Sequence, residues 1–390
     1  MKGRYRFFPS MLRVYELAKS LDKSEIHTLR NFAKTGLEGT DDVAYLVFFD
    51  VLRAQPSCDL SHIKSELRGK LNVTRLSDAR CYLYHRMLDA IQASNRDEVG
   101  DAVNLLSQIK VLMFKGLHHH VSALYEKAME FAEGTEDFET MLKLIRSQKL
   151  VTKRCMAIDA ATTELFALSK KETEIQEKLV NLWAWEKLLD STHSIRGLEK
   201  EARNDFFERL STEKLIVEEG PCLSSKANVV RLLIQDFLLS SKSSVDQRRI
   251  QLLKEVANVL LGHNALLNDA IFLERYLSAL YNIALLGIFH SLEPEVEEAI
   301  SKIEGLSAFR PDAEVLVFEK TAIIKVDGIL NSMELEDGKA TIRWAKNGLL
   351  AFGDRISPRH RASLLLGLSK YYFFRGKYGQ VAKLLHCLLY

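Results

Sequence analysis

Three consecutive histidines, His118 to His120, are the residues whose type most readily suggests metal chemistry. A transition-metal site needs imidazole groups that converge on one ion, usually from positions four apart on a helix or from separate elements. Consecutive helical residues point about 100° apart, so three in a row cannot all reach one ion. We therefore interpret this run as exposed or partly packed histidines at the start of a helix.

A group of acids after Pro294, Glu295, Glu297 and Glu298, has the residue types for general acid–base work. The proline predicts a helix start there, and carboxylates in a first turn are favoured by the helix dipole. The sequence contains no GxSxG, Walker-type, HExxH or glycine-rich dinucleotide motif. We accordingly predict no catalytic, metal-binding or cofactor-binding residue, and expect that the protein is not an enzyme.

The tryptophans could instead mark a peptide-binding surface. Trp183 and Trp185 are two residues apart, which places their indoles on different sides of a helix. We expect one of them in the core and the other more exposed, with core packing the main role of tryptophan here.

Composition sets the fold class. The 390 residues are 47% hydrophobic and 27% charged, with only 6 prolines and 19 glycines. A fold rich in β-turns would use more of both. Apolar residues recur at spacings of three and four almost throughout, which predicts an all-α fold.

Charge and cysteine content indicate the cellular compartment and the kinds of partner. The formal net charge of +2 gives no whole-chain electrostatic footprint for nucleic acid. Five scattered cysteines without CxxC spacing indicate free thiols in a reducing compartment. No signal peptide is evident, and the apolar run from Tyr276 to His290 fits a core helix better than a membrane span. We expect a cytoplasmic protein that uses no membrane and no cofactor.

Several helix boundaries have a local chemical cause. Asp59 or Ser61 can cap one helix, Ser24 another, and Pro358 after Ser357 suits a first helical turn. We expect helices near 152–168, 171–192 and 195–216, the last with two shorter helices as the alternative. Left-handed caps are predicted at five glycines: Gly116, Gly134, Gly220, Gly353 and Gly376. We divide the chain into a helical N-terminal region, 1–95, and two parts of a helical-hairpin array, 96–220 and 226–390.

In two parts of the chain, one of them near the C-terminus, the apolar spacing becomes more specific. Two helical pairs carry it, with these residues: Leu365, Leu368, Ser369, Tyr372, Gly376, Lys377, Tyr378, Val381, Leu385 and Leu388 in one, and Leu105, Leu112, Gly116, Val121, Tyr125 and Ala128 in the other. The pattern resembles the tetratricopeptide repeat family. In a weaker third pair, Gly287 occupies the position at which that family usually has tyrosine. That resemblance implies a helical-hairpin solenoid with a right-handed superhelix and a concave inner surface.

The N-terminal region resembles a narrower group. The stretches Lys23 to Glu25, Tyr45 to Asp50 and Tyr82 to Tyr84 are similar to three helices of a group of helical proteins from the Bacteroidetes. Ile26 to Thr28 and the glycine-rich insert from Gly36 to Thr40 depart from that group. No chemistry is assigned to the group, so the resemblance implies none for this chain.

The tetratricopeptide resemblance also implies which residues line the inner surface. The candidates for partner binding are Lys110, Met113, Phe114, Phe289, Lys370, Phe373 and Phe374. A lysine followed by apolar residues would suit a peptide with acidic groups. The alternative is that the phenylalanines fill the core between helix pairs.

The last helix is strongly apolar, with Leu384, Leu385, Leu388, Leu389 and Tyr390 and nothing polar after them. Stacked arrays need a polar outer cap. We hypothesise that the natural protein continues beyond Tyr390. The alternative is that this helix folds back or forms a homo-oligomer interface.

The sequence favours a non-catalytic protein-interaction scaffold that binds a peptide or protein partner in a concave helical groove. The alternative is a regulatory nucleic-acid-binding protein. In that case Arg75, Arg80 and Arg86 of the N-terminal region would contact phosphates, and the array would act as the sensor. Their spacings of five and six residues do not form one tight stripe, which makes nucleic acid the less favoured partner.

Overall fold

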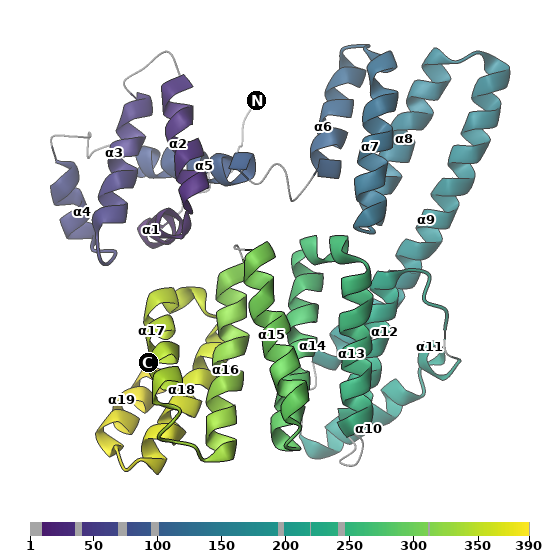
Figure 1. The fold of residues 1–390 in the computed structure, drawn as a ribbon. Coiled ribbons are helices and arrows are strands. Elements are labelled where there is room, and N and C mark those ends of the chain that lie inside the picture. Colours follow the sequence, from purple (N-terminus) through teal and green to yellow (C-terminus); the bar gives the residue numbers. More distant parts are fainter. Residues whose placement is uncertain are drawn as a thin grey trace. The chain divides into compact units, whose positions relative to one another are not determined.

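The fold is described from a computed structural model of the chain. It describes residues 10–35, 41–68, 76–94, 101–193, 199–218, 220–240, 246–310 and 313–389. Over these ranges the chain is all-helical and contains no β-strand, which confirms the predicted fold class (Figure 1). Two compact units divide the chain, Met1–Asn104 and Leu105–Tyr390. The glycine-rich insert 36–40 and Arg75 lie outside the described residues.

In the first unit three helices pack against the fifth helix, and the fourth packs against the third. Its helices are α1 (Met11–Ser20), α2 (Lys23–Thr35), α3 (Asp41–Ala54), α4 (Leu60–Leu67) and α5 (Leu76–Ser94). Helix α5 packs against α1, α2 and α3, and α4 packs against α3. Tyr45, Phe48 and Phe49 of α3 are at the centre of the core. The Tyr45 hydroxyl donates to the Leu29 carbonyl at 3.1 Å, so the buried phenol is satisfied.

The second unit is a succession of helices, most of which pack against a neighbour along the chain. Its helices are α6 (Asp101–Phe114), α7 (Val121–Gly134), α8 (Phe138–Cys155), α9 (Ile158–His193), α10 (Lys200–Ser211), α11 (Lys214–Val217), α12 (Ser225–Ser240), α13 (Asp246–Gly262), α14 (Ala270–Phe289), α15 (Glu293–Phe309), α16 (Glu314–Ser332), α17 (Lys339–Phe352), α18 (Pro358–Phe374) and α19 (Tyr378–Leu389). Helix α6 begins just before the division between the units. Helix α9 packs against α8 and α12, and α13 packs against α14.

From α12 onward the helices come in pairs with a regular spacing. The first helices of the four pairs begin at Ser225, Ala270, Glu314 and Pro358, at intervals of 45, 44 and 44 residues. Helix α14 packs against α16, and α16 against α18, so these three first helices are neighbours. Each also packs against the second helix of its own pair (Figure 1).

The turns that end α6, α14 and α18 share one geometry. Gly116, Ser291 and Gly376 each lie two residues beyond the last helical residue, with φ of 76°, 56° and 68°. After α18 the Lys377 N–H donates to the Tyr372 carbonyl at 2.9 Å, the six-residue bond of a Schellman turn. Left-handed caps are therefore confirmed at Gly116 and Gly376. Gly353, directly after α17, also has a positive φ of 51° but with ψ of −123°, and Gly220 has no positive φ. Gly134 is different, because the left-handed residue after α7 is Glu136.

Small residues lie where helices approach most closely. A Cβ atom on Gly348 of α17 would lie 2.1 Å from the Phe318 ring of α16. A Cβ on Gly287 would lie 2.8 Å from Val296 of α15, so a larger residue would not fit at this position without a shift. These contacts place the apolar seams of the pairs in direct van der Waals contact.

Helix starts follow local chemistry with one correction. Ser357 accepts from the His360 N–H and Pro358 occupies the first turn, as predicted. At α2 the cap is Asp22 and not Ser24. Asp22 accepts from the Glu25 N–H at 2.8 Å, and the Glu25 carboxylate accepts from the Asp22 N–H at 2.9 Å, which is a capping box.

Two other boundaries differ between sequence and structure. The predicted helices 152–168 and 171–192 are not separate: α9 is continuous over 36 residues, about 54 Å of helix. No glycine or proline interrupts it. The span 195–216 contains two helices, α10 and α11, separated at Thr212 and Glu213, as in the alternative that we considered.

Helix α14 is long and apolar enough to cross a membrane by length and composition alone. Half of its most apolar window is buried inside the unit. Its buried side chains belong to the core formed with α13, α15 and α16, which supports the interpretation as a core helix.

Candidate functional site

The four phenylalanines predicted on the inner surface are exposed. Phe114 is 92% exposed, Phe289 76%, Phe373 55% and Phe374 52%. They end α6, α14 and α18, next to the turns that follow these helices. None fills the core, so the alternative of core packing does not apply to them. Of the other predicted residues, Lys110 and Lys370 are exposed and Met113 is partly buried.

The tryptophan pair divides as predicted. Trp185 is 1% exposed and lies in the core, whereas Trp183 is 52% exposed. Trp183 belongs to a face of α9 with other large exposed apolar residues: Ile158 at 84%, Phe166 at 76% and Val180 at 61%. At 100° per residue these four lie within an arc of about 100°, so they share one side of the helix. We call this side the α9 face.

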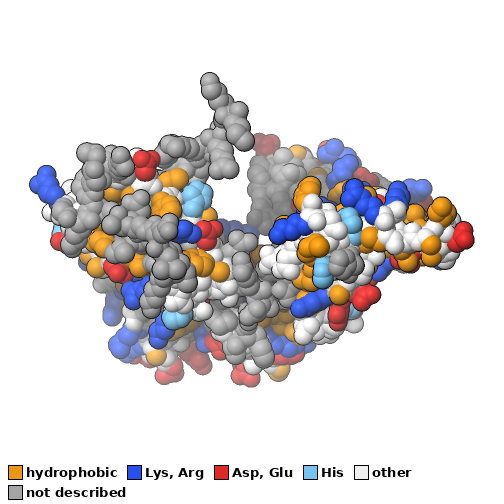
Figure 2. All heavy atoms as spheres, turned by 90° about the horizontal axis from the view of Figure 1, so that it is seen from above, with side chains coloured by type: hydrophobic (Ala, Val, Ile, Leu, Met, Phe, Trp, Pro, Cys, Tyr) orange, Lys and Arg blue, Asp and Glu red, His pale blue; other side chains and the backbone are white. Residues whose placement is uncertain are grey.

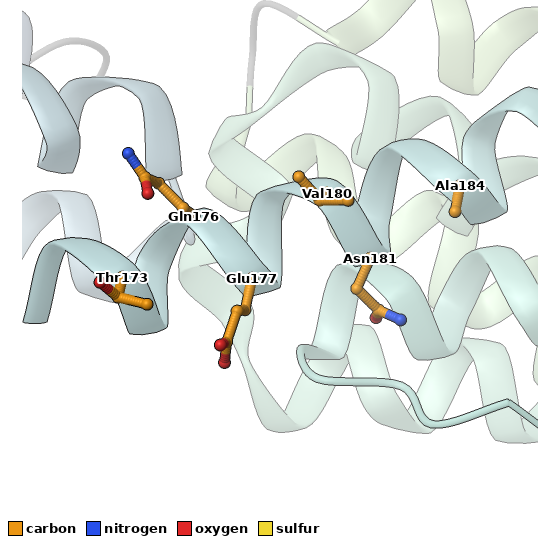
Figure 3. Close-up of a pocket in the computed structure, with 6 residues that line it drawn as sticks. All are labelled: Thr173, Gln176, Glu177, Val180, Asn181 and Ala184. Carbon is orange, nitrogen blue, oxygen red and sulfur yellow. The ribbon is translucent and has the colours of Figure 1, made fainter. Parts of the chain in front are cut away.

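An open groove of about 470 Å³ lies along part of this face. Its lining residues project from successive turns of α9 (Figure 3) and are Thr173, Gln176, Glu177, Val180, Asn181 and Ala184. Val180 and Ala184 are its apolar side chains, and the other four are polar. Such a surface can accept the ridge of another helix. We call it the α9 groove.

Polar contacts hold α9 firmly against its neighbours. In its first half Glu172 accepts from Lys149 at 2.6 Å and from Arg146 at 3.3 Å, both on α8. These two cations lower the pKa of the Glu172 carboxyl. In its second half Asn181 accepts from the Leu223 N–H at 3.0 Å and donates to the Pro221 carbonyl at 2.8 Å. The segment before α12 is thereby fixed beside the groove.

The start of α12 is held by a residue far away in the sequence. The Glu136 carboxylate, in the turn between α7 and α8, accepts from the N–H groups of Ser225 and Lys226 at 2.9 and 2.8 Å. Two amides that a helix start leaves unpaired are satisfied in this way. The contact joins segments 89 residues apart.

A buried cluster of ionisable groups lies between α14, α16 and α18. Glu319 and Lys320 of α16 are each 3% exposed. The Lys320 Nζ atom lies 2.8 Å from Glu274 Oε1, 3.4 Å from Ser278 Oγ and 3.1 Å from His360 Nε2. An ammonium group has three donors, so all of them are satisfied. Sequence reasoning did not identify this cluster, because its members come from three helices.

The proton of His360 can be assigned from these contacts. Because Lys320 can only donate, Nε2 of His360 accepts and the proton resides on Nδ1. Nδ1 lies 2.6 Å from Ser357 Oγ and 3.2 Å from Glu319 Oε2. Burial, followed by the charge of Lys320, lowers the pKa of His360 to about 4. Burial also raises the pKa of the Glu319 carboxyl.

Serine, histidine and glutamate are the residue types of a hydrolytic triad, but their geometry is different. In a triad one imidazole nitrogen contacts the nucleophile and the other contacts the carboxylate. Here Nδ1 contacts both groups, and Nε2 faces an ammonium. Ser357 is also the cap of α18. The arrangement therefore holds three helices together and does not activate the serine.

The remaining sequence candidates have ordinary structural partners. His118 to His120 form one 3₁₀ turn, and no cluster of three metal-ligating side chains occurs within the described ranges. Glu295 pairs with Lys254 at 3.0 Å. Arg86 donates to the Tyr82 hydroxyl on its own helix.

Comparison with known proteins finds no relative. No family model matches this sequence, and searches of curated proteins and of solved structures find no significant match.

Proposed function

We propose that this chain is a non-catalytic scaffold that binds a protein partner, and that the α9 face is its principal docking surface. One observation carries the proposal: a continuous, rigidly held helix face exposes Ile158, Phe166, Val180 and Trp183 beside a groove. Large exposed apolar residues gathered on one face are typical of interaction surfaces. Figure 2 shows hydrophobic side chains reaching the surface between charged side chains of both signs.

The architecture supports the same proposal. We infer that the helix pairs from α12 to α19 form a stacked array of the kind that tetratricopeptide proteins form. The intervals of 44 and 45 residues exceed the about 34 residues of that family, so the units are longer. The neighbouring positions of α14, α16 and α18 support stacking. Such arrays present extended surfaces to other macromolecules.

The partner element that fits the α9 groove is the apolar side of an amphipathic helix. The groove follows one helix over positions 173 to 184, a length that suits helix-on-helix packing. Trp183 at its border can supply a large anchor, since tryptophan is enriched among residues that dominate binding energy. Free thiols at all five cysteines support a reducing, cytoplasmic location.

Site-specific photo-crosslinking in cells tests this proposal. A photoreactive amino acid at Trp183 should capture a partner that the same group at Gln251, an exposed residue of α13, does not capture. With that partner purified, Val180→Asp should weaken binding at least tenfold, because it places a charge in the apolar contact. Equal capture at both positions would refute the docking surface. If Phe114→Ala plus Phe374→Ala abolished binding while Val180→Asp left it unchanged, the partner would lie on the inner surface instead.

A further inference from the structure

Charge is distributed unevenly along the chain. After Asp354 the sequence contains seven lysines and arginines and no aspartate or glutamate. The first 354 residues contain 47 basic and 52 acidic residues. The net charge of +2 therefore conceals a strongly basic last pair of helices, α18 and α19. We call this pair the basic hairpin.

Four cations of the basic hairpin are available to a ligand. Arg359, Lys370, Lys377 and Lys383 are exposed, and no ion pair joins them to a carboxylate of the described residues. Two further arginines are engaged: Arg361 pairs with Asp354 at 2.6 Å and Arg375 with Glu336 at 2.5 Å.

Three aromatic rings lie among these cations. Phe373, Phe374 and Tyr378 are 55%, 52% and 64% exposed. The Phe373 ring centroid is 5.9 Å from that of Phe374 and 5.8 Å from that of Tyr378. Lys370 is three residues before Phe373 on α18, which makes the two side chains neighbours on the helix surface. Lys377 directly precedes Tyr378, so lysines flank the rings on both sides.

Two carboxyl groups on neighbouring elements act on these lysines. Asp327 of α16 interacts with Lys370, and burial raises the pKa of this carboxyl. Glu336, already bonded to Arg375 and Lys339, interacts with Lys377. Arg359 lies about 21 Å along α18 from Phe373 and does not contribute here. Lys370, Lys377 and Arg375 still outnumber the two acids, so the surface around the rings stays positive.

The ligand that matches this surface is a flexible polyanion with flat apolar faces. Single-stranded nucleic acid supplies a phosphate and a stackable base in every nucleotide, and aromatic side chains among basic ones are how proteins hold it. Rings that project with more than half of their surface exposed offer faces for stacking. We propose that the basic hairpin binds single-stranded nucleic acid, with bases stacked on Phe373, Phe374 and Tyr378 and phosphates on Lys370 and Lys377.

This site is independent of the α9 face. It reassigns Lys370, Phe373 and Phe374 from a peptide groove to a nucleic-acid surface. It also places such a surface at the opposite end of the sequence from Arg80 and Arg86. The whole-chain charge balance that disfavoured nucleic acid does not apply to this hairpin, because charges more than about one Debye length away are screened.

Fluorescence anisotropy with the full chain tests the proposal. The probes are labelled oligo-uridine and oligo-thymidine of about 20 nucleotides, a length that spans several stacking positions. Binding should weaken steeply with salt. Lys370→Gln plus Lys377→Gln should lower the slope of log affinity against log salt by about 1.4, or about 0.7 for each phosphate contact. Phe373→Ala plus Tyr378→Ala should lower affinity about 5- to 150-fold per ring with little change in slope.

The chain offers a matched control on α6. Phe114 is an exposed phenylalanine between the exposed lysines Lys110 and Lys115. Phe114→Ala plus Lys110→Gln and Lys115→Gln should leave oligonucleotide binding unchanged. Because all the altered residues are exposed, circular dichroism should report wild-type helix content in every variant.

Three results would overturn the assignment. The first is no binding at low salt, and the second is unchanged affinity after Phe373→Ala plus Tyr378→Ala. The third is displacement of the oligonucleotide by poly-glutamate at equal charge concentration, which would identify an acidic protein segment as the ligand. Val180→Asp should not affect oligonucleotide binding, so failure of this proposal and failure of the α9 face are separate results.

Discussion

The neutral state of His360 makes a specific prediction about pH. The pKa of this imidazole falls from an ordinary value of about 6.5 to about 4 in the folded chain. Between these values the unfolded chain takes up a proton that the folded chain does not. Stability therefore falls as pH falls through this window. Linkage gives a loss of about 2 kcal/mol between pH 7 and pH 5 from this group alone.

The replacement His360→Asn isolates that contribution. The asparagine amide can occupy the position of Nδ1–H and donate to Glu319, but it does not titrate. Lys320 keeps Glu274 and Ser278 as acceptors. The raised pKa of Glu319 acts in the opposite direction, and this effect is common to both proteins, so it cancels in their difference.

Urea unfolding at pH 7 and pH 5, followed by tryptophan fluorescence, provides the measurement. Trp344 reports on this region, because its ring lies 5.2 Å from Phe318 in the core that α16 and α18 share. Between pH 7 and pH 5 the free energy of unfolding of the wild type should fall by about 2 kcal/mol more than that of His360→Asn. An equal loss in both proteins would show that the imidazole is not held neutral, and would refute the assigned contacts.

Three further predictions concern stability and need only thermal or urea unfolding. Gly348→Ala should destabilise the protein by about 1–3 kcal/mol, because its Cβ would meet the Phe318 ring at 2.1 Å. Gly305→Ala, whose Cβ would meet no other atom, should stabilise it by up to about 1 kcal/mol. Equal effects would contradict the close contact between α16 and α17. Trp185→Ala should lower the free energy of unfolding by about 3–5 kcal/mol, because this side chain is buried. Trp183→Ala should change it by no more than about 0.5 kcal/mol, because this side chain is exposed. Similar losses would mean that Trp183 is covered. Glu136→Ala should cost about 1–2 kcal/mol by uncapping α12, and Glu136→Gln less, since one acceptor oxygen remains; an unchanged midpoint for Glu136→Ala would argue against the cap.

Features that depend on a few adjacent residues could be predicted from the sequence. The cap at Ser357 and Pro358 and the division between Trp183 and Trp185 both follow from local geometry. The choice of Asp22 over Ser24 as a cap did not, although both are good capping residues. What separates them is the reciprocal bond of Glu25 three residues after Asp22, a signature that the sequence does contain.

Features that depend on distant residues could not be predicted. Glu136 caps a helix 89 residues away, and neither partner carries a local signal of the contact. The buried Glu319–Lys320 pair does have a weak signal, since it interrupts an apolar stretch on both sides. Its partners on α14 and α18 become apparent only when the three helices are adjacent.

The charged run that includes Lys170 and Lys171 illustrates a different difficulty. The expected helices 152–168 and 171–192 leave a break next to this run, whereas α9 passes through it without interruption. Lysine and glutamate are good helix formers, so polarity alone does not end a helix in the absence of glycine or proline.

Lys320 also limits how modular this chain can be. Proteins built from repeated hairpins usually tolerate the gain or loss of a unit, because each unit contacts only its neighbours through similar apolar seams. Here one ammonium bridges acceptors on the units before and after its own. Deleting the pair α18–α19 would remove His360 from it, and duplicating a unit beside α16 would require a new acceptor at that position. The boundary between these units is therefore a poor place for recombination, in evolution or in engineering.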